Sequence, residues 1–407
     1  MKRVISLFSG LGGLDLGLEG GFETPTRCLN SNIHPDWFVS PSRQGYHILP
    51  KTSFDTIFAN DIKSSAKHAW QGVMRRTGNY HIASIIDLVK QALQGTGPLC
   101  GLQAELITGG FPCQDFSVCG KKQGFGSAIT HDGSYDPTVP TVESRGMLYY
   151  WMMQTIKLIQ PHMFIAENVK GIKSFDNVMK TIVSDFESIG YHVFTPRTLY
   201  APQYGIAQTR ERVFFIGYNK SKLTAQANAL ILDESPLVDP YPQPTHNFLS
   251  INGKASFLAT NAMPAITTLD ILGDLDEPHT TPTDVDHNHY SRAKYYGRHC
   301  QGNTEVPLNG PANTIRSQHH GNIEFRRLSA ANGGTHLLEL SAGKPERRLS
   351  VRECARIQSL PDSAKIATGT NAVTGAEAYR LVGNAVPPLL AYHIGRRIES
   401  IWSNLFG

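Results

Sequence analysis

Short apolar runs alternate with helix-forming segments in the first half of the chain, and this alternation constrains the fold more than any other feature. The runs that predict strands are "RVISLF", "FDTIFAND", "AELITGG", "HMFIAENV" and "RERVFFIGY". Between them, "SGLGGLDLGLEGG", "MLYYWMMQTIKLIQ" and "VMKTIVSDFESIG" have an apolar spacing that is typical of helices. Strands that alternate with helices predict a parallel sheet covered on both faces. We therefore predict an α/β fold with a doubly wound sheet.

The composition changes after about residue 219. Residues 219–345 are rich in Pro, Asn, Gly, His and Thr and contain only short apolar runs, which predicts loops and short strands. "LSVRECARIQSLPD" then predicts a helix that starts at a capping box of Ser350 and Glu353 and ends at Pro361. "GNAVPPLLAYHIGRRIESIW" predicts a final helix that returns to the first domain.

We accordingly predict a first domain at residues 1–218, completed by a C-terminal helix at about 376–407, and a smaller domain at 219–375. Residues 27–53 and 119–145 are expected to be long polar loops of the first domain.

Charge and cysteine content exclude several classes of protein. The 407 residues carry a formal net charge of +4, which permits a polyanionic partner without requiring one. The six cysteines form no C-x-x-C pair and are too few for a disulfide scaffold.

No apolar stretch approaches the length of a membrane span or a signal-peptide core, so we expect a cytoplasmic protein without a membrane partner. "HNH" at 287–289 and the pair His319 and His320 have no clustered acid or cysteine, and no metal site is expected.

Ligands of open parallel sheets bind outside the carboxyl ends of the strands. The glycine loop "FSGLGG" follows the first strand, where its backbone and the next helix could approach a ligand closely. Asp61 ends the second strand, and an acid there suits a pair of ribose hydroxyls, although a helix N-cap explains it equally well. Cys113 follows a strand, two glycines and a proline. The start of a helix or loop at this position could favour the thiolate form of its side chain. The alternative is an inert, buried cysteine.

Three further charged residues lie at or near predicted strands. Glu167 ends the apolar strand "HMFIAENV", and burying a carboxylate there is costly without a partner or a function. Arg210 and Arg212 are two residues apart in an extended run and could grip a phosphate or carboxylate from one face. A structural ion pair for Glu167, and a surface pair for the two arginines, are the alternatives.

In their order along the chain, these motifs resemble the DNA (cytosine-5)-methyltransferase family. The resemblance rests on "FSGLGGLDLGLEGGF", "GGFPCQDFS", "IAENV", "AQTRERVFFIG", "RRLSVRECARIQSLPD" and "YRLVGNAVPP", and it runs from residue 4 to about 392. It implies a Rossmann-like S-adenosylmethionine-dependent methyltransferase fold with a smaller target-recognition domain, whose variable part is the unmatched segment at about 219–345. The unsplit order also resembles a bacterial restriction–modification enzyme or a solitary methylase.

The resemblance implies a cofactor, S-adenosylmethionine, and a set of residues around it. The implied residues are Phe8, Gly10, Leu11, Gly12, Gly13, Asp61, Ile62, Ser84, Pro112, Leu148 and Asn384. Asp61 would hold the ribose. Ser84 stands where the family often has an acid that contacts adenine, and Ile62 stands where an aromatic residue is expected.

The implied chemistry explains why a thiol is needed in "GGFPCQDFS". Carbon 5 of cytosine is a poor nucleophile, and a thiolate that adds to carbon 6 would activate it. Cys113 is the expected nucleophile, with Gln114 beside it, and Glu167 would stabilise the adduct near N3. Arg212 would contact O2 of the base and Arg210 the DNA backbone. The cytosine must first be flipped out of the duplex.

Sequence reading is expected in the second domain. The stretch "PANTIRSQHHGNIEFRR" combines side chains that can pair with base edges, although a solvated polar loop followed by a strand is the alternative. The predicted DNA-contacting residues are Ser117, Arg316, Gln318, Arg326 and Arg327. The expected partner is double-stranded DNA, read by a monomer, with any paired restriction endonuclease acting on the same site without a stable complex.

Three other functions fit parts of the pattern. An RNA cytosine-5 methyltransferase of the same fold would not need the long segment between the two sets of motifs. A catalytically silent DNA-binding protein would not need Cys113, Glu167 and Arg212 together. A small-molecule methyltransferase fits least well.

Overall fold

The structure of the protein is a computed structural model that describes residues 1–407 except 113–146, 234, 250–254, 257–260, 298–301, 318–322 and 368–372. Its centre is an eight-stranded sheet in the order β10-β11-β8-β7-β1-β5-β6, with β9 paired to β11. The strands are β1 (Lys2–Leu7), β5 (Phe54–Asp61), β6 (Tyr80–Ile82), β7 (Leu106–Gly110), β8 (Met163–Val169), β9 (Tyr191–Val193), β10 (Arg197–Tyr200) and β11 (Glu211–Asn219).

The sheet is mixed, which corrects the prediction of a parallel one. β6, β5, β1, β7 and β8 run parallel, whereas β11 is antiparallel to β8, β9 and β10. The chain passes from β10 to β11 through residues 201–210 without an α-helix. A connection this short reverses the chain direction, because a parallel neighbour needs a longer crossover.

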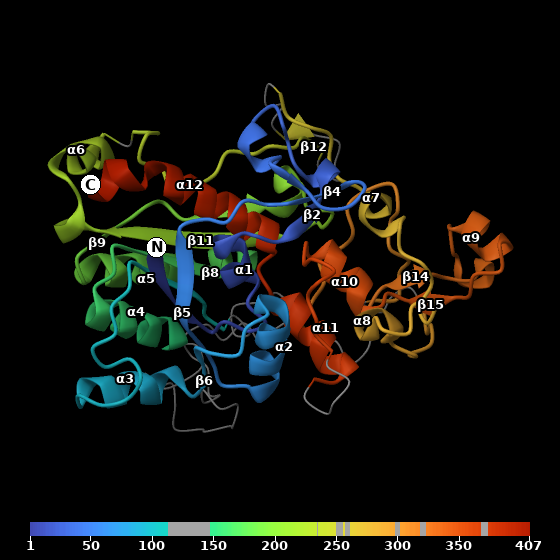
Figure 1. The fold of residues 1–407 in the computed structure, drawn as a ribbon, viewed down its shortest axis with the longest axis horizontal. Helices are drawn as coiled ribbons and strands as arrows, with labels where there is room; N and C mark the ends of the chain where they lie inside the picture. The colour runs from blue at the N-terminus through green and yellow to red at the C-terminus, as the bar shows by residue number, and fades with distance from the viewer. Residues whose placement is uncertain are drawn as a thin grey trace.

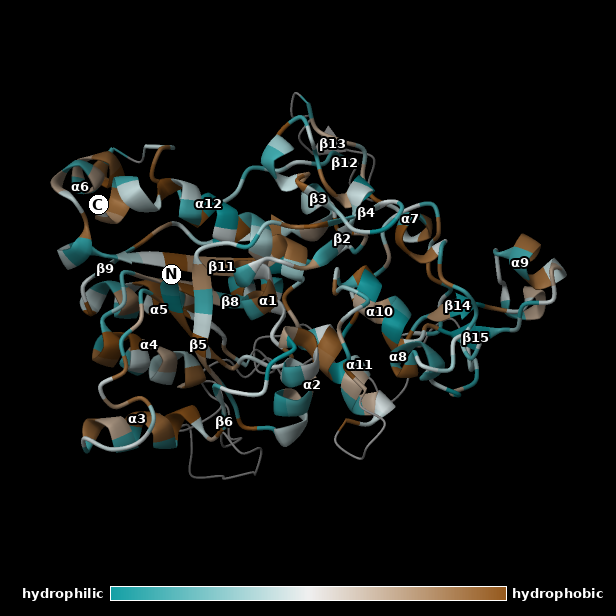
Figure 2. Cartoon of the chain, viewed as in Figure 1, coloured by the Kyte–Doolittle hydropathy of each residue, from teal (hydrophilic) through white to brown (hydrophobic). Residues whose placement is uncertain are grey.

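Helices cover both faces of this sheet, as predicted (Figure 1). One face carries α3 (Ile85–Leu93), α4 (Leu148–Ile159) and α5 (Asp176–Ser188), and the other carries α1 (Gly13–Glu19), α2 (Ser64–Met74) and α12 (Pro388–Phe406). Adjacent residues of β7 face opposite ways, since Leu106 belongs to one core cluster and Ile107 to the other. Figure 2 shows mostly hydrophobic residues along α3 and α4, as expected of helices that lie on a buried sheet face.

The C-terminal helix α12 packs against α1. The close approach depends on glycines of α1. A Cβ atom at Gly17 would lie 2.3 Å from the carbonyl oxygen of Pro388 and 2.4 Å from Cβ of Ala391. A Cβ atom at Gly13 would lie 2.3 Å from the carbonyl oxygen of Val386. The glycines therefore let the two helix backbones come together.

The second half of the chain forms short elements, as its composition predicts. They are α6 (Ala225–Leu232), β12 (Phe248–Leu249), β13 (Ala255–Ser256), α7 (Thr268–Leu272), α8 (Val285–Asn288), β14 (Phe325–Arg327), α9 (Leu337–Ser341), β15 (Arg347–Arg348), α10 (Val351–Ile357) and α11 (Gly375–Asn384). The capping box of Ser350 and Glu353 at the start of α10 is present in full. Thr224, which caps α6, donates its backbone N–H to the carbonyl of Leu405, so α6 lies at the end of α12 (Figure 1). The chain thus stays beside the first domain for longer than the change in composition at residue 219 suggests.

The expected polar loop at residues 27–53 is instead a folded part of the molecule. Residues 22–53, which we call the insert, contain a small sheet of β2 (Glu23–Pro25), β3 (Ser40–Pro41) and β4 (Tyr46–Ile48). Trp37 is 1% exposed and packs edge-on against Tyr392 and His393 of α12. The partners of Trp37 lie about 355 residues away in the sequence, so a local pattern could not reveal that this segment is folded.

Candidate active site

The register of the sheet brings the ends of four strands to one edge. Leu7 of β1 pairs with Gly109 of β7, and Gly110 of β7 pairs with Glu167 of β8. The loop after β1 also lies beside the end of β5, since the backbone N–H of Ser9 donates to the carbonyl of Asn60 at 2.8 Å. The glycine loop, Asp61, the Phe-Pro segment and Glu167 therefore share the carboxyl edge of the sheet, where the sequence predicted a ligand.

The glycine loop has a backbone that ordinary residues rarely adopt. Phe8 has φ 53°, Gly10 φ 53° and Gly12 φ 87°. A Cβ atom at Gly12 would lie 2.6 Å from Cδ1 of Trp70, so this position needs glycine for space as well as for φ. At Gly10 a Cβ atom would meet no atom within 4 Å, so its backbone borders open space. Leu11, which is 1% exposed, anchors the loop in the core.

Asp61 faces this loop. One carboxylate oxygen accepts the backbone N–H of Gly10 at 3.2 Å, and the other accepts the N–H of Lys63 at 3.1 Å. Burial raises the pKa of the Asp61 carboxyl above its ordinary value. The N-cap of α2 is Lys63, with no side-chain cap bond, so Asp61 is not the N-cap of that helix. Ile62 is 44% exposed next to it.

The other predicted cofactor residues lie around the same edge. Ser84 is the N-cap of α3 and accepts the N–H of Ile86 at 3.3 Å, so its side chain already has a structural function. Pro112 is half-buried after β7, and Leu148 is the buried first residue of α4. Asn384 is the exposed last residue of α11, immediately before the segment that lies against Gly13.

Glu167 lies beside the strand end that leads to Cys113. Glu167 is 7% exposed, and its carboxylate forms an ion pair with Arg212, with 2.8 Å between Nε and Oε1. A Cβ atom at Gly110 would lie 2.9 Å from Oε2, so the second oxygen is close to the backbone of β7. Burial raises the pKa of Glu167, and the charges of Arg212 and Arg210 oppose this shift without cancelling it.

Cys113, Gln114, Ser117 and Gln318 lie outside the described residues. The backbone that leads to Cys113 is held by Asn168, whose Nδ2 donates to the carbonyl of Phe111 at 3.3 Å. Asn168 was not among the predicted site residues, and its position directly after Glu167 in "IAENV" is the signal in the sequence that could have found it. The end of β7 is thus held on one side by β8, through the pairing of Gly110 with Glu167 and the hydrogen bond from Asn168.

The placement of Arg210 corrects the prediction that it grips the DNA backbone. Its side chain is fully buried, and its guanidinium donates to the carbonyls of Gly383 at 2.9 Å and Ala385 at 2.7 Å. It also donates to the carbonyl of Ile315 at 3.1 Å. Arg210 therefore ties β11 to two segments from later in the chain and does not face a phosphate.

Gln208 has a similar structural function that the sequence analysis missed. Its side chain is fully buried, donates to the carbonyl of Ile357 at 3.2 Å and accepts the N–H of Ile315 at 3.1 Å. The sequence "QTRERVF" shows that Gln208, Arg210 and Arg212 alternate along the chain. It does not show that two of these three side chains are buried.

Arg326 and Arg327 also differ from their prediction. They are 5% and 0% exposed, and both form ion pairs with Glu339 of α9. Arg327 pairs with Glu277 as well, at 2.6 Å. These arginines stabilise the interior of the smaller domain and do not present themselves to bases. Arg316 is exposed, and its backbone lies against Gly383, whose Cβ would be 2.4 Å from the Arg316 carbonyl carbon.

Within the described part of the chain, no group of three or more His, Cys, Asp or Glu residues could hold a metal ion. His287 of the "HNH" stretch instead contacts the Ser350 hydroxyl and the carbonyl of Asp276. None of the described helices has the length and apolar character to cross a membrane.

Comparison with known proteins identifies the class that this fold and site define. The family of C-5 cytosine-specific DNA methylases matches residues 2–400, and the chain belongs to this family. The chain is 30% identical over 403 residues to the Type II methyltransferase M.FnuDI of Fusobacterium nucleatum, covering 98% of this chain and 94% of that protein. It is 28% identical over 419 residues to the Type II methyltransferase M.NgoPII of Neisseria gonorrhoeae, covering 98% and 95%.

Solved structures share the fold at low sequence identity. The Dnmt2 methyltransferase of S. pombe superposes with a TM-score of 0.55 at 15% identity, covering 98% of both chains. The methyltransferase EhMeth of Entamoeba histolytica gives a TM-score of 0.55 at 14% identity, covering 99% of this chain and 98% of that one. These likenesses support the Rossmann-like methyltransferase fold with its mixed sheet.

Proposed function

We propose that this DNA (cytosine-5)-methyltransferase uses S-adenosylmethionine to modify one duplex sequence as part of a Type II restriction–modification system. The observation that carries the proposal is the buried carboxylate of Glu167 beside the strand end that leads to Cys113. The similarity to Type II methyltransferases over nearly the whole chain supports the restriction–modification role. A cytoplasmic location is part of the same proposal, because the substrate is cellular DNA.

The residues at the carboxyl edge of the sheet fit S-adenosylmethionine. The open space over Gly10 leaves room for a ligand against the loop backbone, and the carboxylate of Asp61 lies beside that loop. Asp61 would hold the ribose hydroxyls, and Phe8, Leu11 and Gly13 would line the site. Pro112, Leu148 and Asn384 would close it. When bound, S-adenosylmethionine supplies an electrophilic methyl group on its sulfonium.

The chain itself would make cytosine nucleophilic. The Cys113 thiolate would add to carbon 6 of the flipped base, which raises the electron density at carbon 5. Glu167 would hold a proton at N3, and burial favours this function because it raises the pKa of the carboxyl. Arg212, whose side chain pairs with Glu167, would orient that carboxyl and contact O2 of the base. Loss of the carbon 5 proton would then release Cys113.

Double-stranded DNA is the proposed substrate, bound by a monomer. The family match and the named relatives do not favour an RNA methyltransferase or a silent DNA-binding protein. Arg316 remains a proposed base contact, since it is exposed and its backbone lies beside Gly383, the residue before Asn384. A paired restriction endonuclease would act on the same DNA site without a stable complex.

Covalent trapping tests the proposed nucleophile. A duplex with 5-fluorocytosine at the target position should remain attached to the enzyme, because fluorine cannot leave carbon 5 as a cation. The change Cys113→Ser should abolish both the adduct and methyl transfer, measured by denaturing electrophoresis and by labelled cofactor. Cys100→Ser is the matched control, since Cys100 is a free, exposed cysteine elsewhere in the first domain. An adduct that survives in Cys113→Ser would refute the assignment.

A further inference from the structure

The insert at residues 22–53 contacts both domains of the molecule. On one side it is fixed to α12. Trp37 packs against Tyr392 and His393 with ring centroids 4.8 and 4.7 Å away, and Arg396 pairs with Asp36 at 2.8 Å. The insert is therefore anchored to the catalytic domain through its own small core.

On the other side, the insert is tied to the smaller domain. Asn30 is 1% exposed, and its Nδ2 donates to the carbonyls of Thr245 at 2.9 Å and Asn261 at 2.8 Å. Arg27 forms an ion pair with Asp270 of α7. These ties come from residues that a local reading of the sequence places in a polar loop.

Two further contacts between the insert and the smaller domain belong to one cluster of charged and aromatic side chains. Tyr46 donates its hydroxyl to Asp274 at 3.0 Å, and Arg43 pairs with Asp362 at 2.6 Å. The Arg43 guanidinium lies 3.6 Å from the centre of the Tyr46 ring, so the two side chains support each other. Arg356 of α10 also pairs with both Asp274 and Asp362, which links this cluster to the interior of the smaller domain.

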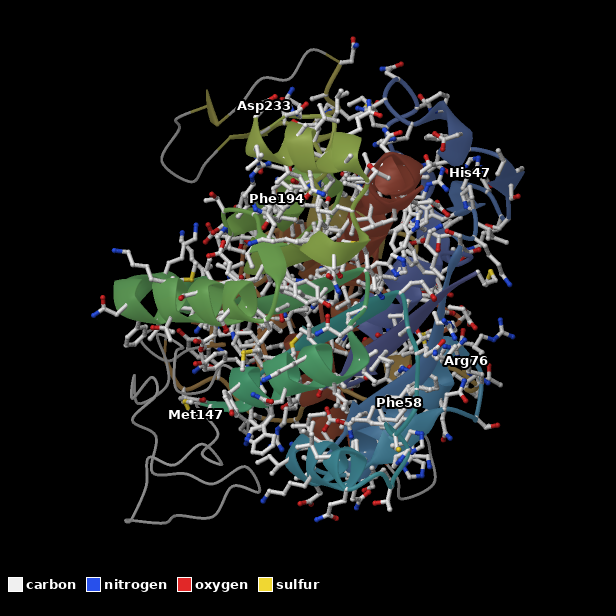
Figure 3. All side chains as sticks on the ribbon, turned by 90° about the vertical axis from the view of Figure 1, so that its left-hand side faces the viewer. His47, Phe58, Arg76, Met147, Phe194 and Asp233 are labelled. Carbon is white, nitrogen blue, oxygen red and sulfur yellow. The ribbon has the colours of Figure 1, made fainter. Side chains whose placement is uncertain are left out.

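These ties lie on the side of the molecule away from the candidate active site. Figure 1 shows β2, β4 and α7 next to one another on the side of α12, whereas α2 and α11 lie on the other side. In Figure 3, His47 of the insert and Met147, which precedes α4, lie at opposite sides of the molecule. The insert therefore connects the domains behind the site without lining it.

We infer that the insert is an interdomain brace that fixes the orientation of the smaller domain and thereby sets the affinity for DNA, not the rate of the chemical step. DNA must contact both domains at once, so a smaller domain held in its binding orientation loses less freedom when DNA binds. If only a fraction of molecules is correctly oriented, the apparent association constant for DNA is the intrinsic constant multiplied by that fraction. The inference rests on the proposed DNA substrate. The turnover number at saturating DNA tests that substrate separately.

The test removes the exposed ties and leaves the buried anchor intact. A triple variant carries Arg27→Ala, Arg43→Ala and Tyr46→Phe. We expect the dissociation constant for target DNA to rise about tenfold, since three exposed ties together are worth roughly that factor. The turnover number at saturating DNA and the dissociation constant for S-adenosylmethionine should change less than about twofold, the error expected where no contact is lost. Amide hydrogen exchange in α7 should become faster, while exchange in α3 stays the same.

Arg3→Ala is the matched control. Arg3 is a half-exposed arginine that pairs with Glu105 at 2.7 Å, and both residues belong to the catalytic domain. It should leave the affinity for DNA unchanged even if it lowers thermal stability as much as the triple variant does. The inference would be overturned if the triple variant bound DNA as tightly as wild type. It would also be overturned if Arg3→Ala lost as much affinity for DNA as the triple variant, or if the triple variant lost only turnover number.

Discussion

Two buried carboxylates at the carboxyl edge of the sheet have different partners. Glu167 has an arginine as its partner, whereas Asp15 has only neutral ones. Asp15 is fully buried beneath the glycine loop and accepts the Ser6 hydroxyl at 2.6 Å and the Trp70 indole N–H at 2.7 Å. Burial outweighs these hydrogen bonds and raises the pKa of Asp15 to about 6.

Asp15 should therefore make the protein less stable as the pH rises. The folded chain keeps this proton between pH 3.8, the ordinary value, and about 6, whereas the unfolded chain loses it. Stability falls wherever the folded state binds more protons, so this group lowers the free energy of unfolding by about 3 kcal/mol across that interval. Asp15→Asn should remove the effect, because an amide can accept from Trp70 and donate to Ser6 without ionising.

The measurement is the difference in free energy of unfolding between wild type and Asp15→Asn, taken by urea titration at several pH values. The free energy of unfolding of Asp15→Asn, relative to that of wild type, should increase between pH 4 and pH 7. Asp55→Asn, which removes a carboxyl from a half-exposed site on the same sheet, is the control for the loss of one acidic group. A constant difference across this range would contradict the raised pKa of Asp15.

At the scale of elements, the contact between α1 and α12 holds the C-terminal helix on the sheet. The first turn of α12 follows the segment that lies against Gly13, so this contact also places Asn384 at the edge of the glycine loop. The packing of two helices thus positions residues from opposite ends of the chain at one site.

Gly17→Ala should destabilise the protein by about 3 kcal/mol, because the added methyl group would press on the backbone of α12. Alanine in a helix would otherwise be favourable by about 1 kcal/mol, so a loss of stability isolates the helix contact. Denaturant unfolding measures the change. Gly78→Ala is the control, since a Cβ atom there meets nothing within 4 Å. Equal stabilities of the two variants would show that α12 can move aside without cost.

At the scale of the whole molecule, the proposed catalytic residues and the proposed base contact lie in different parts of the chain. The described catalytic candidates lie on strands of the first domain, whereas Arg316 is exposed on the smaller one. α6 lies on α12, and α7 is tied to the insert, so both belong to the framework that joins the domains. The segment of the chain whose sequence can vary with the DNA target should therefore begin after α6 and α7.

A chimera tests this division. Replacing residues 290–345 with the corresponding segment of a methylase of different specificity should transfer the donor's target site, because the framework and catalytic edge are retained. Bisulfite sequencing of a random-site DNA library identifies the methylated site. An active chimera that still methylates the original site would place recognition elsewhere, and the insert would then be the next segment to exchange.

Much of this protein follows from its sequence because the signals are local. The alternation of apolar runs with helices predicts a covered sheet, since each pattern records which face of an element is buried. The capping box of Ser350 and Glu353 predicts the start of α10, because both hydrogen bonds form within four residues. The ordered motifs that contain the glycine loop, Cys113 and Glu167 predict the family and the candidate site, because each lies at or just after the end of an apolar run.

Only the tertiary structure decides the function of residues whose partners are distant in the sequence. Arg210, Arg326 and Arg327 resemble DNA contacts by type and spacing, yet their partners lie up to 175 residues away and draw them into the interior. The insert resembles a polar loop, yet α12 buries its tryptophan and the smaller domain binds its arginines. The sequence records which residues can be buried or paired. Which of them are buried depends on contacts that form only when remote segments pack together.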